Sequence, residues 1–224
     1  HGPAMMWIAA GTLLSAERQV WAGVAFGAAI LTRPHTALVA AGNGLVQAVA
    51  KRTVRPAIRI VIGSAMGLAL LVAYNTVVFG APSIAGGYGS GFNERTSSLD
   101  LVEYAGNIAL ALVHPLRGLL IFSPFLILLI PGLKAAWRAA PAWVQGSALG
   151  GLLYLLLQLK ANRYSGGSGF WGYRYPLETL AAAAPLLLLA YSEWVERQSE
   201  LIRKLFRWLV IASVLLTATG AIVY

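Results

Sequence analysis

The strongest constraint on this fold is a series of apolar runs separated by short polar breaks. Hydrophobic residues make up 58% of the chain and charged residues 11%, whereas a soluble domain carries about 25% charged residues. This pattern places the chain in the membrane class. We expect an all-α, polytopic transmembrane helix bundle that forms a single integral membrane domain over residues 1–224.

Eight apolar runs predict about eight membrane-embedded helices, although several are short for a span of about 20 residues. The runs are Pro3–Ser15, Val20–Thr32, Thr36–Ala50, Ile60–Phe79, Leu119–Leu133, Trp143–Leu159, Thr179–Ser192 and Leu209–Val223. Most Lys and Arg residues in the breaks fall in one alternate set of loops: Ala16–Gln19, Lys51–Arg59, Lys134–Pro141 and Glu193–Arg207. The positive-inside rule predicts that this set is cytoplasmic. The other loops, and Tyr224, are then expected outside a cell (plasma) membrane.

Several segments between the runs are predicted individually. Glycines make most of Gly80–Asp100 a loop, and Leu101–Val113 has the pattern of an amphipathic helix lying in the membrane interface. Pro124 should kink the helix that contains it. Glu193–Arg207 is predicted to be a solvated helix at the cytoplasmic surface.

The composition also restricts the kinds of site. Cysteine is absent, which excludes disulfides and thiolate metal sites, and three widely spaced histidines argue against zinc. A divalent metal held by oxygen ligands remains open. The net charge of +9 fits basic loops beside anionic lipid headgroups. Membrane lipids are therefore expected partners, and nucleic acid is not.

Arg33 lies between two short runs, Val20–Thr32 and Thr36–Ala50, at a predicted helix break before Pro34. Helices of this length reach only about 20 Å, so their turn would lie below the outer membrane surface. An arginine at that depth is expected to face a water-filled cavity or a polar partner. The alternative is a tilted hairpin or a thinned bilayer, with Arg33 reaching the interface.

The polar stretch Lys160–Glu178 is the other conspicuous exception in the apolar chain. Arginines around a cavity suit a phosphate, and aromatic rings suit a sugar or an isoprenoid chain. The expected outward groups are Arg33, His35, Glu94, Arg95, Asp100, Arg117, Arg163, Trp171, Tyr173, Arg174, Tyr175 and Glu178. Tyr164 and Trp171 could instead belong to an interfacial aromatic belt, and Arg117 and Lys160 could be interface anchors.

Five short motifs together resemble the membrane half of GT-C glycosyltransferases, which include protein O-mannosyltransferases and aminoarabinose transferases. Ala22–Gly27 leading to Leu31–Pro34 is similar to a "GLxxGLAxLTKP/RP" hairpin in that superfamily. The others are Tyr74–Tyr88 ("YN…FGSP…GY"), Arg117–Pro124 ("RGLLxYSP"), Gly166–Tyr175 ("GGxxWGxRY") and the His-Xaa-Pro start at His1. His1-Gly2-Pro3 could also be a protease-cleavage remnant.

The resemblance implies an enzyme that takes a sugar from a polyprenyl phosphate on the extracytoplasmic side and transfers it to a cell-envelope acceptor. It assigns the donor phosphate to Arg33 and Arg174, with His35 and Arg163 beside them. Tyr88, Arg117, Trp171, Tyr173 and Tyr175 are the expected substrate-facing residues. A carboxylate should act as general base, and we expect it upstream of residue 1, with Glu94 or Asp100 in a supporting role.

Two other interpretations remain open at this stage. The chain could be a non-catalytic membrane protein, such as a lipid-phosphate transporter, a flippase subunit or a scaffolding subunit. It could also complete its site with a missing N-terminal portion or with a second membrane chain. A transporter should carry charges near the membrane midplane and an internal repeat, and no repeat is visible in the sequence.

Overall fold

The computed structural model describes residues 1–80, 82–84, 86, 100–167 and 171–223. Within these ranges the chain is all-helical, as predicted, and contains no strand. Of the helices described, α4 (Arg55–Phe79) and α9 (Ala142–Ala161) are long and apolar enough to cross a membrane. Eight membrane spans are therefore not confirmed, because several predicted runs form helices of fewer than 18 residues.

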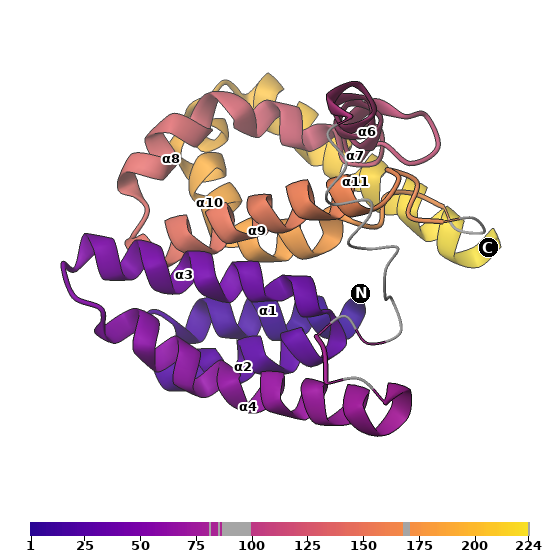
Figure 1. Cartoon of the computed structure of the whole chain (residues 1–224). Coiled ribbons are helices and arrows are strands. Elements are labelled where there is room, and N and C mark those ends of the chain that lie inside the picture. Colours follow the sequence, from indigo (N-terminus) through magenta and orange to yellow (C-terminus); the bar gives the residue numbers. More distant parts are fainter. Residues whose placement is uncertain (81, 85, 87–99, 168–170, 224) are drawn as a thin grey trace. The chain divides into compact units, whose positions relative to one another are not determined.

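The described chain forms two compact units that alternate along the sequence (Figure 1). The first unit comprises His1–Leu99, Pro141–Ala161 and Leu177–Ala184. The second comprises Asp100–Ala140, Asn162–Pro176 and Pro185–Tyr224. The boundary at Pro185 falls inside helix α10 (Pro176–Glu193), so this helix contributes to both units.

The first unit contains α1 (Gly2–Leu14), α2 (Gln19–Thr32), the 3-10 turn η1 (Pro34–Thr36), α3 (Ala37–Ala50), α4 and α9, together with the start of α10. In this unit α2 packs against α4, and α3 against α9 (Figure 1). Helix α4 begins at Arg55, before the predicted Ile60, because Pro56 favours its first turn. It ends at Phe79, and Gly80 follows as a left-handed cap with φ 68°.

Glycines bring the helices of the first unit unusually close together. A Cβ on Gly67 of α4 would lie 2.2 Å from the backbone oxygen of Gly27 in α2. A Cβ on Gly42 of α3 would lie 2.7 Å from the backbone oxygen of Gly146 in α9. Such small-residue contacts are typical of helix pairs in membranes. The two pairs therefore fix the helix spacing through backbone contact.

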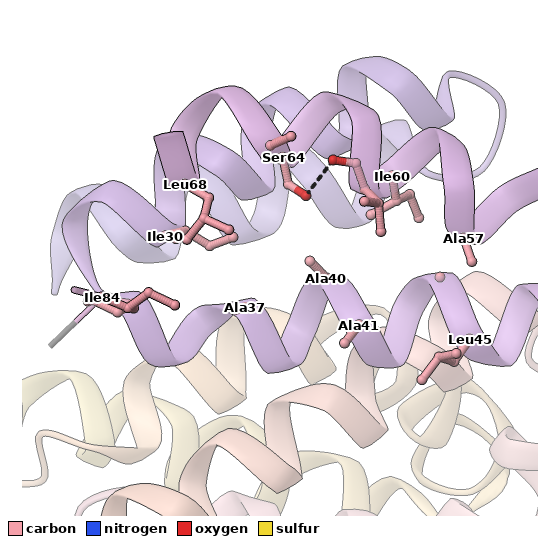
Figure 2. A pocket seen from close by; sticks show the side chains of 14 residues that line it. Ile30, Ala37, Ala40, Ala41, Leu45, Ala57, Ile60, Ser64, Leu68 and Ile84 are labelled. Carbon is pink, nitrogen blue, oxygen red and sulfur yellow. Dashed lines mark hydrogen bonds between the residues drawn. The ribbon is translucent and has the colours of Figure 1, made fainter. Parts of the chain in front are cut away.

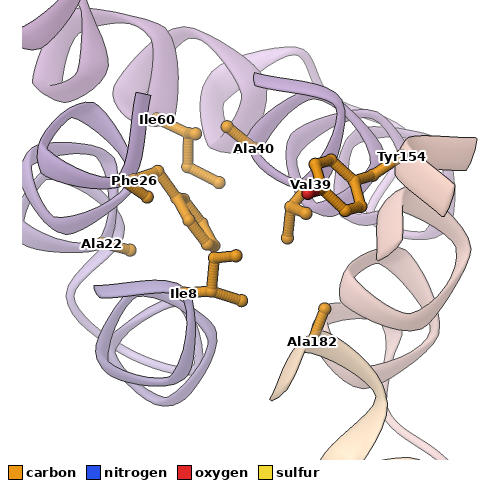
Figure 3. Close-up of a cluster of buried hydrophobic side chains, with 9 residues drawn as sticks. Ile8, Ala22, Phe26, Val39, Ala40, Ile60, Tyr154 and Ala182 are labelled. Atoms are coloured by element: carbon orange, nitrogen blue, oxygen red, sulfur yellow. The ribbon is translucent and has the colours of Figure 1, made fainter. Parts of the chain in front are cut away.

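The apolar core of the first unit gathers side chains from six helices (Figure 3). Ile8, Phe26 and Val39 are fully buried there, and Tyr154 of α9 contributes its ring. Ala182 of α10 closes the cluster. Because this ring is packed in the core, the position of the Tyr154 hydroxyl is determined by the fold.

A polar network, which the sequence did not predict, is buried around α3. Asn43 donates hydrogen bonds to the hydroxyls of Ser15 and Ser147, at 3.0 and 2.7 Å. It accepts one at 2.8 Å from Gln47, whose side-chain oxygen in turn accepts a bond from Gln19. Buried polar groups that are satisfied in this way favour one arrangement of the helices they join.

The second unit contains α6 (Leu101–Val113), α7 (Leu119–Phe122), the 3-10 helix η3 (Pro124–Gly132), α8 (Leu133–Ala139), the end of α10, η4 (Val195–Arg197) and α11 (Glu200–Val223). Helix α6 has the predicted bounds, and Asp100 caps it by accepting hydrogen bonds from the backbone nitrogens of Val102 and Glu103. The predicted kink is a complete break, since α7 ends before Ser123 and η3 begins at Pro124.

The prediction of a separate surface helix over Glu193–Arg207 was wrong. The acidic start of that stretch ends α10, and α11 runs without interruption from Glu200 through the last apolar run. No proline or glycine lies between Glu200 and Gly220, so nothing stops the helix after its charged residues. Glu200 pairs with Arg203 and Arg207, both at 2.9 Å.

Candidate anion site at the Arg33 turn

Arg33 is placed by a local break in the chain, as the sequence predicted. Helix α2 ends at Thr32, and Arg33 is extended, with φ −151° and ψ 101°. Pro34 then begins η1, while the hydroxyl of Thr36 donates to the Arg33 carbonyl at 2.8 Å. The break turns the chain back into α3 and leaves the Arg33 side chain at the end of the hairpin.

The guanidinium of Arg33 lies among polar groups from distant parts of the first unit. Its Nη1 donates to the hydroxyl of Tyr154 at 2.9 Å and lies 3.4 Å from Oε1 of Glu178. Its Nη2 lies 2.9 Å from Nε2 of His1. The Arg33 side chain is 19% exposed. Arg33 therefore has polar partners at the turn and keeps part of its surface accessible.

The contacts of His1 define its protonation state. Arginine can only donate hydrogen bonds, so Nε2 of His1 must accept from Arg33. Nδ1 then carries the proton and donates to Oε1 of Glu178 at 2.7 Å. His1 is therefore a neutral imidazole that links the guanidinium to the carboxylate.

Glu178 has a fully buried side chain. Its Oε1 receives the His1 hydrogen bond, whereas its Oε2 has no hydrogen-bond partner among the described residues. Burial raises the pKa of the Glu178 carboxyl, and the nearby Arg33 charge opposes that rise. We call Arg33, His1, Tyr154 and Glu178 the Arg33 cluster.

His35 lies at the edge of the Arg33 cluster. Its Nδ1 is 3.4 Å from Nε2 of Gln158, which also donates to the Tyr154 hydroxyl at 3.4 Å. Burial lowers the pKa of His35, and the charge of Arg33 lowers it further. His35 is thus a neutral neighbour of the cluster and adds no positive charge to it near pH 7.

An apolar groove of about 410 Å³ begins beside the Arg33 turn. Pro34 and Ile30 line it near the turn, and it continues along α3 and α4 to Leu45 and Ala57 (Figure 2). Ser64 contributes its polar side chain, but that hydroxyl donates to the Val61 carbonyl. Along η1 and α3, the eleven residue steps from Pro34 to Leu45 correspond to about 16 Å of helix rise. A hydrocarbon chain suits this lining.

The second unit holds another arginine arrangement, which the sequence predicted only in part. Arg174 donates to the carbonyl of Gly166 at 2.8 Å. Arg117 donates to the carbonyls on either side of it, those of Ser165 (2.8 Å) and Gly167. Two arginines thus bind three successive carbonyls of one turn. Arg174 and Arg33 fall in different units, so their expected convergence on one phosphate remains a prediction.

The expected aromatic residues have structural partners within the second unit. Trp171 donates to the carbonyl of Leu216 and packs edge-on against Phe122, and the hydroxyl of Tyr173 lies 2.9 Å from that of Ser123. Tyr175 is buried, whereas Arg163 is exposed. Glu94, Arg95 and Tyr88 lie outside the described residues, and Asp100 serves as the cap of α6.

Three members of the Arg33 cluster were not predicted as site residues: His1, Tyr154 and Glu178. The sequence predicts Glu178 only as one of the groups on the outward side, and its side chain is buried. One signal was present in the sequence, because Tyr154 and Gln158 are polar side chains four residues apart in an apolar run. Within the described residues, no group of three His, Asp or Glu side chains could hold a metal ion.

No protein-family model, curated protein or solved structure matches this chain.

Proposed function

We propose that this protein is an integral membrane glycosyltransferase of the GT-C type. It binds a polyprenyl-phosphate-linked sugar on the extracytoplasmic side and transfers the sugar to a cell-envelope acceptor. The observation that carries the proposal is the partly exposed Arg33 guanidinium at a turn whose next residue, Pro34, lines an apolar groove. The five short motifs that resemble the superfamily support the same function.

The two parts of this site suit the two parts of such a donor. A phosphate diester carries a negative charge that a guanidinium binds by charge-assisted hydrogen bonds. A polyprenyl chain is hydrocarbon throughout, and its burial in the groove contributes roughly 25 cal/mol per Å² of apolar surface removed from water. A soluble anion would use only Arg33, and a neutral lipid would use only the groove.

The remaining donor contacts are proposed from the sequence. Arg174, with Arg163 nearby, would contact the phosphate, and Trp171, Tyr173, Tyr175, Tyr88 and Arg117 would contact the sugar or its acceptor. Glu94 or Asp100 would assist acceptor binding, and a divalent metal could take part.

Transfer activity of the full-length protein in liposomes tests the proposal, with a panel of radiolabelled polyprenyl-phosphate sugars as donors and envelope extracts as acceptors. Arg33→Gln should reduce transfer at least tenfold, because a charge-assisted contact is worth about 1.5–3 kcal/mol. The exposed Arg55 offers a matched control, and Arg55→Gln should leave transfer unchanged. Full activity of Arg33→Gln would contradict the assigned role.

The same assay distinguishes the alternative of a lipid-phosphate transporter, a flippase subunit or a scaffolding subunit. Such a protein would bind the donor, or move it between leaflets, without cleaving the bond between sugar and phosphate. Donor binding that depends on Arg33, in the absence of any sugar transfer by the full-length protein, would favour that alternative.

A further inference from the structure

Glu178 and Arg33 form a charge-balanced pair inside the first unit. Arg33 contributes one positive charge and Glu178 one negative charge. The His1 imidazole between them is neutral, while the α-amino group of the same residue acts more weakly on Glu178. The pair is close, at 3.4 Å, and the carboxylate is completely buried. Glu178 therefore depends on Arg33 for most of its charge compensation, because a buried carboxylate without a partner is strongly destabilising.

The contacts of Glu178 show that its compensation is incomplete. Oε1 is engaged by His1 and by the Arg33 charge, and the Tyr154 hydroxyl also acts on the carboxyl. Oε2 nevertheless lacks a hydrogen-bond partner within the described part of the chain. Any second anion that draws on the Arg33 charge would leave the carboxylate still less compensated. Two anions beside one guanidinium compete, and the competition is relieved when one of them is neutralised by a proton.

We propose that Glu178 is a positioning residue that holds Arg33 in place and competes with the lipid phosphate for its charge, so that phosphate binding is coupled to proton uptake by Glu178. This inference rests on the proposed function, since it concerns the phosphate of the polyprenyl donor. Glu178 acts through Arg33 and His1 and is not assigned any contact with the donor. Its charge keeps donor affinity below the maximum that Arg33 alone would give.

The coupling predicts how affinity changes when the Glu178 charge is removed. The probe is a polyprenyl methyl phosphate diester, which carries a fixed charge and no sugar. Binding to the full-length protein in detergent is followed by intrinsic tryptophan fluorescence. Glu178→Gln keeps the side-chain shape and should lower the Kd about five- to tenfold, the usual size of such coupling.

Repeating the Glu178→Gln substitution in the Arg33→Gln variant separates this effect on the Kd from a general change of structure. Because Glu178 acts through Arg33, Glu178→Gln should not change the Kd when Arg33→Gln is already present, as in a double-mutant cycle. Glu193→Gln removes a surface partner of Arg197 and should have no effect in either background. Equal effects of Glu178→Gln in both backgrounds would overturn the proposal.

The pH dependence of binding gives a readout that does not rely on a folded variant. In the wild-type protein the Kd for the diester should fall as the pH is lowered from about 8 to about 5, because protonating Glu178 releases Arg33. His1, His35 and Tyr154 also surround the site, and all three remain in Glu178→Gln. The part of the pH dependence of the Kd that disappears in Glu178→Gln is therefore due to Glu178.

The outcomes separate the two proposals. If the wild-type protein does not bind the diester at any pH, the proposed function fails and this inference fails with it. If the wild-type protein binds the diester, but Glu178→Gln binds no more tightly and keeps the same pH slope, only the role of Glu178 is overturned. Where Glu178→Gln does not fold, a pH-independent wild-type Kd overturns the role by itself.

Discussion

At the scale of single residues, the Arg33 cluster depends on one hydroxyl group in an otherwise apolar core. The Tyr154 ring packs among core side chains, while its hydroxyl accepts hydrogen bonds from Arg33 and Gln158. Burying a tyrosine hydroxyl is favourable only when it has such partners. Tyr154 therefore links the packing of the core to the position of the guanidinium.

Tyr154→Phe tests this link. The variant keeps the ring but removes the buried hydroxyl that accepts hydrogen bonds from Arg33 and Gln158, so we expect a loss of about 1–3 kcal/mol in the free energy of unfolding. Thermal unfolding in detergent measures it. Tyr74→Phe is a matched control, because Tyr74 is 58% exposed, and its stability should match that of the wild type. A loss no larger than that of the control would contradict the role of the hydroxyl.

At the scale of helices, the contact between α2 and α4 leaves no space for side chains. Gly67→Ala should be destabilised by about 1–3 kcal/mol, because the new Cβ would overlap the backbone of Gly27, which cannot rotate away. The thermal midpoint in detergent gives the measurement. If the midpoint were unchanged, the two helices would not pack as closely as described.

Gly106 in α6 supplies the opposite case. A Cβ at this position meets nothing within 4 Å, and alanine is a better helix former than glycine. Gly106→Ala should therefore be as stable as the wild type or slightly more stable. The contrast with Gly67→Ala separates steric overlap from the general effect of replacing a glycine in a helix.

The helices were predictable where the sequence contains a local signal. The bounds of α6 followed from its apolar periodicity, and the break at Arg33 followed from Pro34. The start of α11 was not predictable from its charges, because charged residues do not end a helix, and the helix runs through them from Glu200. The cluster around Arg33 was only half predictable, since Tyr154 is 121 residues away and only tertiary packing brings it close.

At the scale of the whole molecule, the membrane topology is open to a direct test. The chain contains no cysteine, so single-cysteine variants can be labelled without background. Arg52 and Pro82 flank α4 and are both exposed. If α4 spans the membrane, Arg52→Cys and Pro82→Cys should react with a membrane-impermeant maleimide from opposite sides, and the positive-inside rule places Pro82 outside.

Intact cells and inverted vesicles provide the two sides for this measurement. Labelling of Pro82→Cys only in intact cells, and of Arg52→Cys only in inverted vesicles, would support the proposed orientation. The reverse pattern would place the Arg33 turn on the cytoplasmic side and exclude an extracytoplasmic donor site. Labelling of both variants from one side would show that α4 does not cross.

The long sequence separations within the Arg33 cluster also have a consequence for biosynthesis. Tyr154 follows Arg33 by 121 residues, and Glu178 follows His1 by 177. At about 5–20 residues per second, the ribosome needs roughly 6 to 24 seconds to advance from Arg33 to Tyr154. During that interval the nascent hairpin holds a cation whose later partners, Tyr154 and Glu178, do not yet exist. Ribosomes that stop before α10 would therefore release chains with an uncompensated arginine, a feature by which membrane quality control could distinguish them from finished molecules.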